Sequence, residues 1–404
     1  MILILRRTSH ALYAIVWSAI IGMLTAGYLN LINWIIKRIW GPYLLTGAIW
    51  YPFIICIPFG FLIGFLNKKL GDYPLTIKKV LYSVKKEGKV NYHDWWKTAV
   101  LGLSSLGAGG SIGPEASTTV LVSSMINWLG DRLRWASQFN KNIWFAKMPK
   151  QELEKSDKFG SLFSNKKVEK LIITLLTLVG VAGAAFIFKL FPEKGVFGIH
   201  NRIIFWSWSS LLNVVPALIV VFGFGYFFVH LKNWFAILIN ERINKIWQGG
   251  IFGLIFALST LISVNMLFSG EFRIVPFSEE MLRFSVLYLL IIGIGKAVVT
   301  NLGFVMGWRG GTIFPAIFCS VAIGGALAQM LPGDPRITIA IVLTTSLMMI
   351  LRNAPLVIIL LMLLISVQLL PIVIAISVII AWIQKNTREL KKLSSIFYLY
   401  QLFG

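Results

Sequence analysis

Residues 109–114 read Gly-Gly-Ser-Ile-Gly-Pro, and residues 310–315 read Gly-Gly-Thr-Ile-Phe-Pro. The pattern Gly-Gly-Ser/Thr-Ile-x-Pro thus occurs once in each half of the chain; we call the copies the first motif and the second motif. Each copy precedes a mostly apolar stretch typical of a helix. Chance recurrence in a glycine-rich chain is one explanation. Broken helices at equivalent places in two halves are, however, typical of transporters, so we interpret the copies as a duplication.

The residue types in the two motifs predict an anion site. Glycines let the backbone turn tightly and approach a ligand, and proline is tolerated in the first turn of a helix. A helix N-terminus offers unpaired N–H donors and about half a positive charge. Two such ends directed at one point would bind an anion, yet weakly enough to release it. The predicted anion-binding residues are Gly110, Ser111, Ile112, Gly113, Pro114, Gly311, Thr312, Ile313, Phe314 and Pro315.

The composition places the chain in a lipid bilayer. Of its 404 residues, 57% are hydrophobic and 13% are charged, and the mean hydropathy is +0.78. A helical span needs roughly 20 mostly apolar residues, and many segments come near that length. We therefore predict an all-α, multi-pass membrane protein. Its hydrophobic segments lie near residues 11–36, 44–66, 97–129, 168–191, 203–231, 247–267, 284–306, 311–331, 336–364 and 366–383.

The run from Leu106 to Pro114 lies within one of these segments and should break its helix inside the membrane. Irregular backbone at that depth is tolerated only where it is buried or lines a wet cavity, so the break itself indicates function. We predict a single transmembrane domain over the whole chain. Its parts are a first half-repeat (1–202), a second half-repeat (203–384) and a short cytoplasmic C-terminal tail (385–404).

The chain is strongly basic, with 38 Lys and Arg against 16 Asp and Glu and a net charge of +22. In a membrane protein this excess is explained by short cytoplasmic loops that orient the spans, not by a nucleic-acid partner. It also raises the anion concentration near a pore mouth. The polar, basic segment 130–170 is predicted to be a cytoplasmic loop.

The sequence contains few of the residue patterns that an enzyme active site or a metal site requires. The four histidines are widely scattered, and Cys56 and Cys319 each lie in an apolar segment. We find no metal-ligand spacing, no nucleophile motif and no phosphate-binding loop. We therefore expect no metal, no cofactor and no enzymatic activity. A membrane-embedded enzyme or a structural membrane partner is the hypothesis from another class.

The motifs resemble those of the CLC family of chloride channels and chloride/proton exchangers. The first motif is similar to the family's Gly-Lys/Arg-Glu-Gly-Pro, and the second to its Gly-x-Phe-x-Pro. Residues 352–356 (Arg-Asn-Ala-Pro-Leu) resemble the family's Arg-Ala-Pro-Leu, and residues 296–300 (Lys-Ala-Val-Val-Thr) also fit. The resemblance implies two inverted-topology halves with broken or re-entrant helices. It also implies a homodimer with one pore per subunit, which we expect in the plasma membrane.

One departure from the family concerns its gating glutamate, whose position falls at Ile112. An isoleucine cannot carry a proton or compete with an anion. Glu115 lies three residues further, about one helical turn away and on a similar face. It is either a displaced gate, whose carboxylate occupies the anion site until protonated, or a first-turn acid that complements the helix dipole.

A second departure concerns the inner part of the family's ion site. Its Gly-Ser-Gly-x-Pro motif corresponds here to residues 70–74, Leu-Gly-Asp-Tyr-Pro, which lack the serine. Asp72 either repels anions or caps the next helix. The family's ion-coordinating tyrosine has candidates in Tyr398 and Tyr400. The inner-site candidates are therefore Gly71, Asp72, Tyr73 and Tyr398.

The function we predict is passive conduction of a small anion, chloride first. The alternative is a proton-coupled chloride or fluoride antiporter with Glu115 as its gate. The nearest acid to the family's inner proton-relay glutamate is Glu193, whose Pro and Lys neighbours suit an ordinary loop end. The sequence thus shows no clear buried proton path, which favours the channel.

Overall fold

The computed structural model describes residues 2–76, 79–80, 82–83, 92–139, 141–148, 166–191, 212–239, 243–271 and 273–403. Every regular element in these ranges is a helix, which confirms the all-α prediction. The α-helices are α1 (Ile2–Thr46), α2 (Tyr51–Leu70), α4 (Trp95–Gly107), α5 (Glu115–Gln138), α7 (Lys166–Leu190), α9 (Val214–Leu238), α10 (Lys245–Ser259), α11 (Ile274–Glu280), α12 (Val286–Val305), α13 (Ile313–Met330), α14 (Pro335–Leu351), α15 (Ala354–Leu364) and α16 (Leu370–Phe403). Three short 3-10 turns join them: η2 (Val264–Met266), η3 (Met281–Arg283) and η4 (Val367–Leu369).

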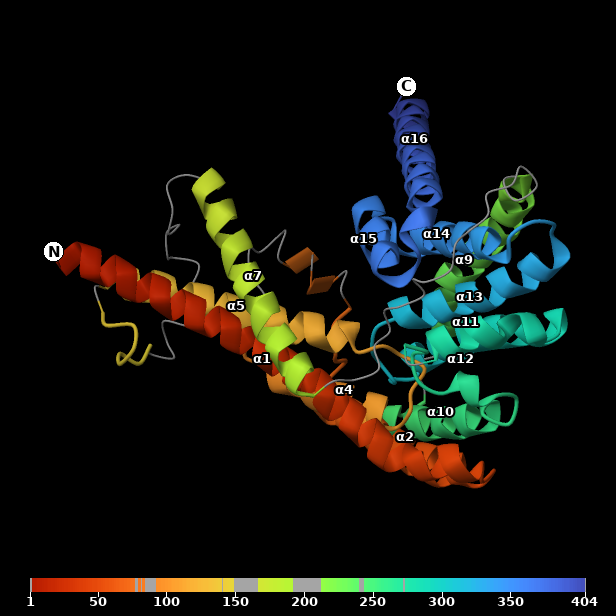
Figure 1. Cartoon of the computed structure of the whole chain (residues 1–404), viewed down its shortest axis with the longest axis horizontal. Helices are drawn as coiled ribbons and strands as arrows, with labels where there is room; N and C mark the ends of the chain where they lie inside the picture. The colour runs from red at the N-terminus through yellow and green to blue at the C-terminus, as the bar shows by residue number, and fades with distance from the viewer. Residues whose placement is uncertain are drawn as a thin grey trace. The chain divides into compact units, whose positions relative to one another are not determined.

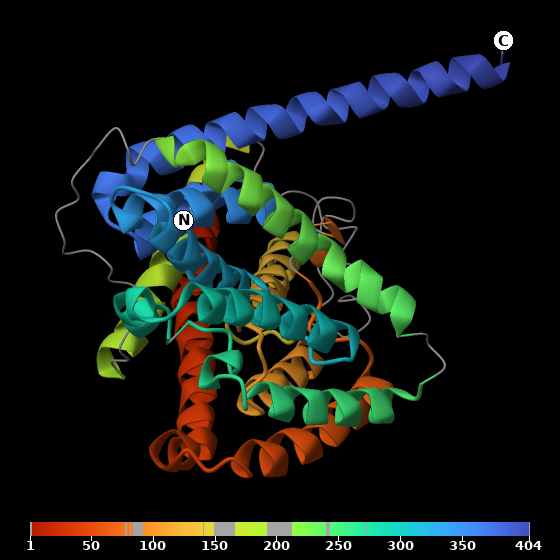
Figure 2. The ribbon, with the colours of Figure 1, turned by 90° about the vertical axis from the view of Figure 1, so that its right-hand side faces the viewer.

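Seven helices are long and apolar enough to cross a bilayer, so the prediction of a multi-pass membrane protein is confirmed. Their spans come from α1, α2, α7, α9, α12, α13 and the start of α16, which Figure 2 shows as one continuous helix. The helices α10, α14 and α15 are apolar but shorter.

The predicted break within segment 97–129 is present, since α4 ends at Gly107 and α5 begins at Glu115. The hydrophobic segment 336–364 is also two helices. The first, α14, ends at Leu351, and the left-handed φ of 55° at its C-cap Arg352 turns the chain. The second, α15, begins after Asn353, whose side chain accepts a hydrogen bond from the Leu356 N–H and so caps the new helix.

The predicted loop 130–170 is shorter than expected, because its first residues continue α5 as far as Gln138. The reason is an apolar cluster in which Trp135 and Ala136 of α5 pack with Tyr13 and Ile21 of α1. Burying these side chains stabilises the additional helical turns although the segment is polar on average. Residues 149–165 of the predicted loop lie outside the described residues.

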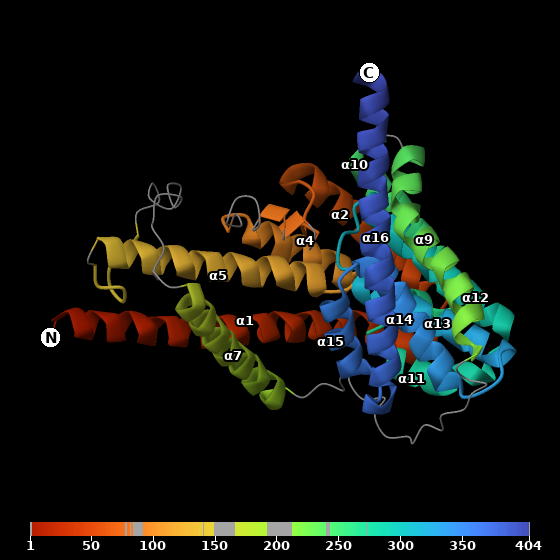
Figure 3. The ribbon, with the colours of Figure 1, turned by 90° about the horizontal axis from the view of Figure 1, so that it is seen from above.

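The structure divides into two compact units. The first comprises residues 1–47, 69–107 and 114–193. In it α5 runs alongside α1 and α7 crosses α1 (Figures 1 and 3). The α1–α7 crossing is very close, because a Cβ on Gly22 would lie 1.8 Å from the carbonyl oxygen of Gly180. Small residues at such crossings let membrane helices approach closely and so gain packing contacts.

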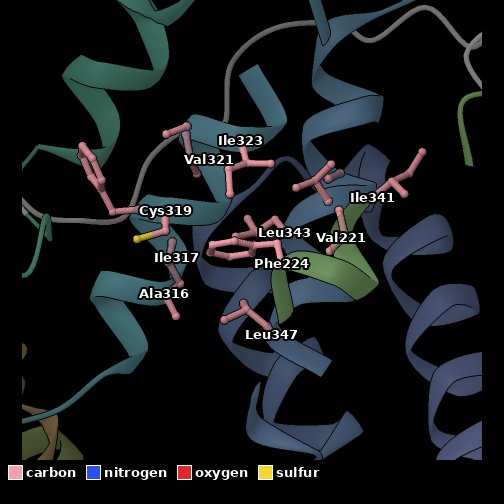
Figure 4. Packing of buried hydrophobic residues seen from close by; sticks show 14 of the residues in the cluster. Val221, Phe224, Ala316, Ile317, Cys319, Val321, Ile323, Ile341, Leu343 and Leu347 are labelled. Atoms are coloured by element: carbon pink, nitrogen blue, oxygen red, sulfur yellow. The ribbon is translucent and has the colours of Figure 1, made fainter. Parts of the chain in front are cut away.

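The second unit comprises residues 48–68, 108–113 and 194–404, and it contains the largest apolar core. That core is built where α9, α12, α13 and α14 pack together. Figure 4 shows side chains from three of these helices, among them Phe224 of α9, Ile317 of α13 and Leu343 of α14. Every residue of α13 from Pro315 to Ala328 is buried, so this helix forms the centre of the unit.

The helices α2 and α10 also cross within the second unit, through glycines spaced four residues apart. A Cβ on Gly60 would lie 2.4 Å from the Gly249 carbonyl oxygen, and one on Gly249 would lie 2.2 Å from the Gly60 carbonyl oxygen. Gly64 and Gly253 repeat the close approach one turn away, against the carbonyls of Lys245 and Cys56. The two backbones therefore touch, and no other residue type fits.

We expect Gly60→Ala to destabilise the protein by about 1–3 kcal/mol, because its methyl group would overlap backbone atoms that cannot move aside. The matched control is Gly223→Ala on α9, where a Cβ meets nothing within 4 Å. Alanine is ordinarily a better helix former than glycine by up to about 1 kcal/mol, so the control should unfold at the same temperature or higher. Thermal unfolding in detergent measures both; equal midpoints would contradict the crossing.

Candidate functional site

The first motif forms an irregular turn between α4 and α5. Gly109 has a φ of +81°, and the Ile112 N–H donates to the Gly110 carbonyl at 2.8 Å. Ser111 and Ile112 are only 3% and 2% exposed. The turn is therefore buried irregular backbone, the kind of structure that a membrane protein tolerates only where protein or a cavity surrounds it.

The second motif lies between α12 and α13, and the residues just before it are held by contacts with two other helices, α2 and α10. Asn67 of α2 donates its amide N–H to the Gly307 carbonyl at 2.8 Å, and the Trp308 indole donates to the Gly249 carbonyl of α10 at 3.3 Å. Gly307 has a φ of +97°, and a Cβ there would lie 2.6 Å from the Asn67 amide nitrogen. These contacts fix the backbone that leads into α13.

The structure brings the two motifs together through their glycines. The Gly113 N–H donates to the Gly311 carbonyl at 2.8 Å, and the Gly311 N–H donates to the Gly113 carbonyl at 2.7 Å, as in an isolated antiparallel bridge. Beside this pair, Ile112 packs against Gly310, where an added Cβ would lie 2.6 Å from Ile112 Cδ1. The amides of Gly113 and Gly311, which the sequence suggested as anion donors, are therefore used to pair the motifs.

Two other motif amides are differently placed. Among the described residues, the backbone N–H groups of Ser111 and Thr312 have no acceptor in the protein. Thr312 is the N-cap of α13 and its side chain does not cap the helix. Pro315 lies in the first turn of α13, as the sequence predicts for proline. The N–H groups of Ser111 and Thr312 are therefore available to an anion.

The Ser111 hydroxyl lies 2.8 Å from the Thr300 hydroxyl of α12, and both residues are buried. Residues 296–300 resemble a family segment, but neither Thr300 nor Lys296 was predicted as a site residue. A signal was present: a lysine inside an apolar run is costly in a membrane and points to function, and a threonine four residues on shares its helix face.

Glu115 is the first residue of α5, with Pro114 as the N-cap. Its side chain is half-buried, and its backbone carbonyl accepts hydrogen bonds from the hydroxyls of Thr118 and Thr119. A carboxylate at this position complements the helix dipole. The displaced gate and the dipole partner both stay hypotheses for this residue.

Of the inner-site candidates, Tyr73 has the clearest surroundings. Its hydroxyl donates to Asp94 at 2.9 Å, and Lys97 lies 2.7 Å from the same carboxylate. Burial and the Asp94 carboxylate raise the pKa of Tyr73 to about 12. Asp72 is exposed, and Gly71 has a φ of +92°. The Tyr73 hydroxyl thus donates its hydrogen bond to the Asp94 carboxylate.

The remaining sequence candidates lie outside the part of the chain whose side chains are described. Tyr398 and Tyr400 lie in the C-terminal part of α16, for which only the backbone is described. Glu193 lies outside the described residues. No cluster of three or more His, Cys, Asp or Glu that could hold a metal is found in the described part of the chain.

The Lys97 ammonium hydrogen bond, together with the one from Tyr73, holds the pKa of Asp94 below its usual value. A lowered carboxyl pKa adds stability that is present above the unfolded pKa of about 4 and is lost as the pH falls through that range. We expect Asp94→Asn to lower stability by less than about 1 kcal/mol at pH 7, because the pair is partly exposed. The difference from the unmutated protein should shrink as the pH falls below about 4.

The measurement for Asp94 is the thermal midpoint in detergent as a function of pH. Glu279→Gln, which removes an exposed carboxylate of α11, is the control and should leave the midpoint almost unchanged. A pH-independent difference between the Asp94 variant and the unmutated protein would contradict the contribution of the ion pair.

Comparisons with known proteins agree with this architecture. A family model described as voltage gated chloride channel matches residues 164–385, more than half of the chain. No curated protein matches the sequence. The structure is similar to that of a CLC-type fluoride/proton antiporter, with a TM-score of 0.68, 16% identity and coverage of 94% of this chain and 96% of the other. It is also similar to a slow cyanobacterial chloride/proton antiporter, with a TM-score of 0.64, 14% identity and coverage of 92% and 94%.

Because the family model matches more than half of the chain, the chain belongs to the voltage gated chloride channel family, the CLC family.

Proposed function

We propose that this protein conducts a small anion, chloride first, passively across the membrane. The observation that carries the proposal is Ile112. It occupies the position that the resemblance gives to a gating glutamate, and it is buried against Gly310. An aliphatic side chain cannot bind a proton or take an anion's place as a carboxylate does. Without a titrating group at this position, the protein has no residue there that could carry a proton in exchange for chloride.

The anion site we propose lies at the paired motifs. The donors that we assign to it are the backbone N–H groups of Ser111 and Thr312, together with the positive end of the α13 dipole. Partial charges of this kind hold an anion less tightly than a lysine or arginine would, which favours fast release. The other predicted residues of the two motifs shape the site and keep it apolar.

Proton-coupled exchange of chloride or fluoride is the alternative, and the two similar structures carry antiporter titles. At 16% and 14% identity they support the fold and not the coupling. Exchange would need a proton carrier, and Glu115 at the start of α5 is the residue we would assign to that role. Its carboxylate would be a displaced gate.

The proposal extends to the surroundings of the protein. We propose a homodimer with one pathway per subunit, located in the plasma membrane and in contact with lipid along its apolar helices. The half-repeats 1–202 and 203–384, with a basic cytoplasmic loop and C-terminal tail, are part of the same proposal. Neither a metal nor a cofactor has a role in this mechanism.

We expect purified protein in liposomes to dissipate a chloride gradient without moving protons uphill. Chloride flux is recorded with a chloride electrode and the internal pH with a fluorescent dye. Proton uptake against its gradient, driven by chloride, would overturn the channel proposal. In that case Glu115→Gln should abolish proton uptake while chloride flux continues. In a channel, the internal pH should stay constant with and without this substitution.

We expect Ile112→Glu to reduce chloride flux at neutral pH, because the added carboxylate would compete with the anion. A negative charge a few ångströms from the site is worth several kcal/mol at low effective dielectric, so a reduction of about tenfold or more is expected. Protonation at low pH should restore the flux. The control is Ile112→Gln, because glutamine has nearly the same shape as glutamate but carries no charge. A glutamate variant whose flux matches that of the glutamine variant at every pH would place Ile112 outside the anion pathway.

A further inference from the structure

Lys296 is a fully buried lysine in the middle of the span α12, with 0% of its surface exposed. Its ammonium nitrogen donates to the backbone carbonyls of four consecutive residues of the segment 265–268. The Nζ–O distances are 2.8 Å to Asn265, 3.3 Å to Met266, 3.2 Å to Leu267 and 2.8 Å to Phe268. The Phe318 ring lies 5.0 Å from the same nitrogen and closes the pocket on one side.

The chemistry of this contact set suits a positive charge. A protonated lysine has three N–H donors and no acceptor, so it matches a group of carbonyl oxygens. A neutral amine would offer two donors and direct its lone pair at an oxygen. Each buried carbonyl left without a donor costs stability, and an intramembrane lysine is itself costly. A residue kept in this arrangement is expected to do more than fill space.

The segment that Lys296 holds is connected directly to the first motif. Phe268 has a φ of +58°, a left-handed conformation that is strained for a residue with a side chain. Its carbonyl accepts from Lys296, and its own N–H donates to the Gly109 carbonyl at 2.7 Å. Lys296 thus stabilises the unusual backbone whose amide fixes the start of the first motif.

A second contact between α12 and the first motif lies one helical turn further. Thr300 follows Lys296 at the i+4 position, on the same face of α12. Its hydroxyl bonds that of Ser111 at 2.8 Å. The first motif is therefore held at Gly109 through Phe268 and Lys296, and at Ser111 through Thr300. Both contacts start from a single rigid helix.

We propose that Lys296 is a positioning residue that sets the geometry, and through it the anion selectivity, of the first motif. The inference rests on the proposed function, because it takes the first motif as part of the anion pathway. Lys296 acts through Phe268 and Gly109 and does not touch the anion. The buried ammonium also cancels the negative potential of four converging carbonyls, which would otherwise oppose an anion nearby.

The experiment combines a structural and a functional measurement on the full-length protein. Lys296→Met keeps the length and apolar volume of the side chain and removes its donors. Lys296→Gln keeps two donors and is the second variant, should the methionine variant fail to fold. Lys245→Met makes the same substitution at an exposed lysine at the start of α10 and is the matched control. Hydrogen exchange of residues 109–113 and 268 reports the backbone, and chloride-to-nitrate permeability ratios report selectivity.

We expect exchange in these residues to accelerate about tenfold or more in Lys296→Met, with a smaller effect in Lys296→Gln and none in Lys245→Met. The chloride-to-nitrate ratio should change in the same order. Faster exchange with an unchanged ratio would support the positioning role and remove the first motif from the anion pathway. Unchanged exchange in folded Lys296 variants would overturn the inference, whatever the flux.

Discussion

The two hydrogen bonds between Gly113 and Gly311 are the constraint on which the rest of the structure depends. Inside a bilayer a backbone group without a partner costs several kcal/mol, so a broken helix needs a compensating partner. Each motif interrupts an apolar stretch, and each supplies the partner that the other lacks. Beside the pair, Ile112 fills the space over Gly310, where an added Cβ would lie 2.6 Å from Ile112 Cδ1.

The hydrogen bonds that stabilise the fold and those that shape the candidate site belong to the same set. Asn67 and Trp308 fix the approach to the second motif, whereas Thr300 and Lys296 fix the first. Asn67 and Lys296 donate to backbone carbonyls of irregular segments, Thr300 bonds the Ser111 hydroxyl, and Trp308 donates to a carbonyl of α10. This distribution is expected when polar groups in a membrane serve a site and not the packing of helices alone.

Membership of the CLC family settles the class of fold, while the chemistry of transport is decided by single positions within it. Under the proposed function, a carboxylate at Ile112 would couple anion binding to pH, and the isoleucine found there cannot. The amides of Gly113 and Gly311 donate to each other's carbonyls, so the proposed anion site has fewer donors than the motif alone suggests. Weak, dipolar binding by a small number of amides is consistent with rapid passage of an anion.

The sequence alone determined the membrane environment, the all-α class, the duplicated motif and the break in the helix before Glu115. These properties follow from composition and local pattern, because hydropathy sets the solvent and glycine with proline ends a helix. It misplaced the end of α5, because the residues that extend this helix to Gln138 are buried by a distant part of the chain. Only the tertiary structure showed that Gly113 pairs with Gly311, that the Tyr73 hydroxyl is bound to Asp94 and that Lys296 supports the first motif through Phe268. Most of these contacts join residues far apart in the chain, and each depends on a side-chain or backbone geometry that no local pattern records.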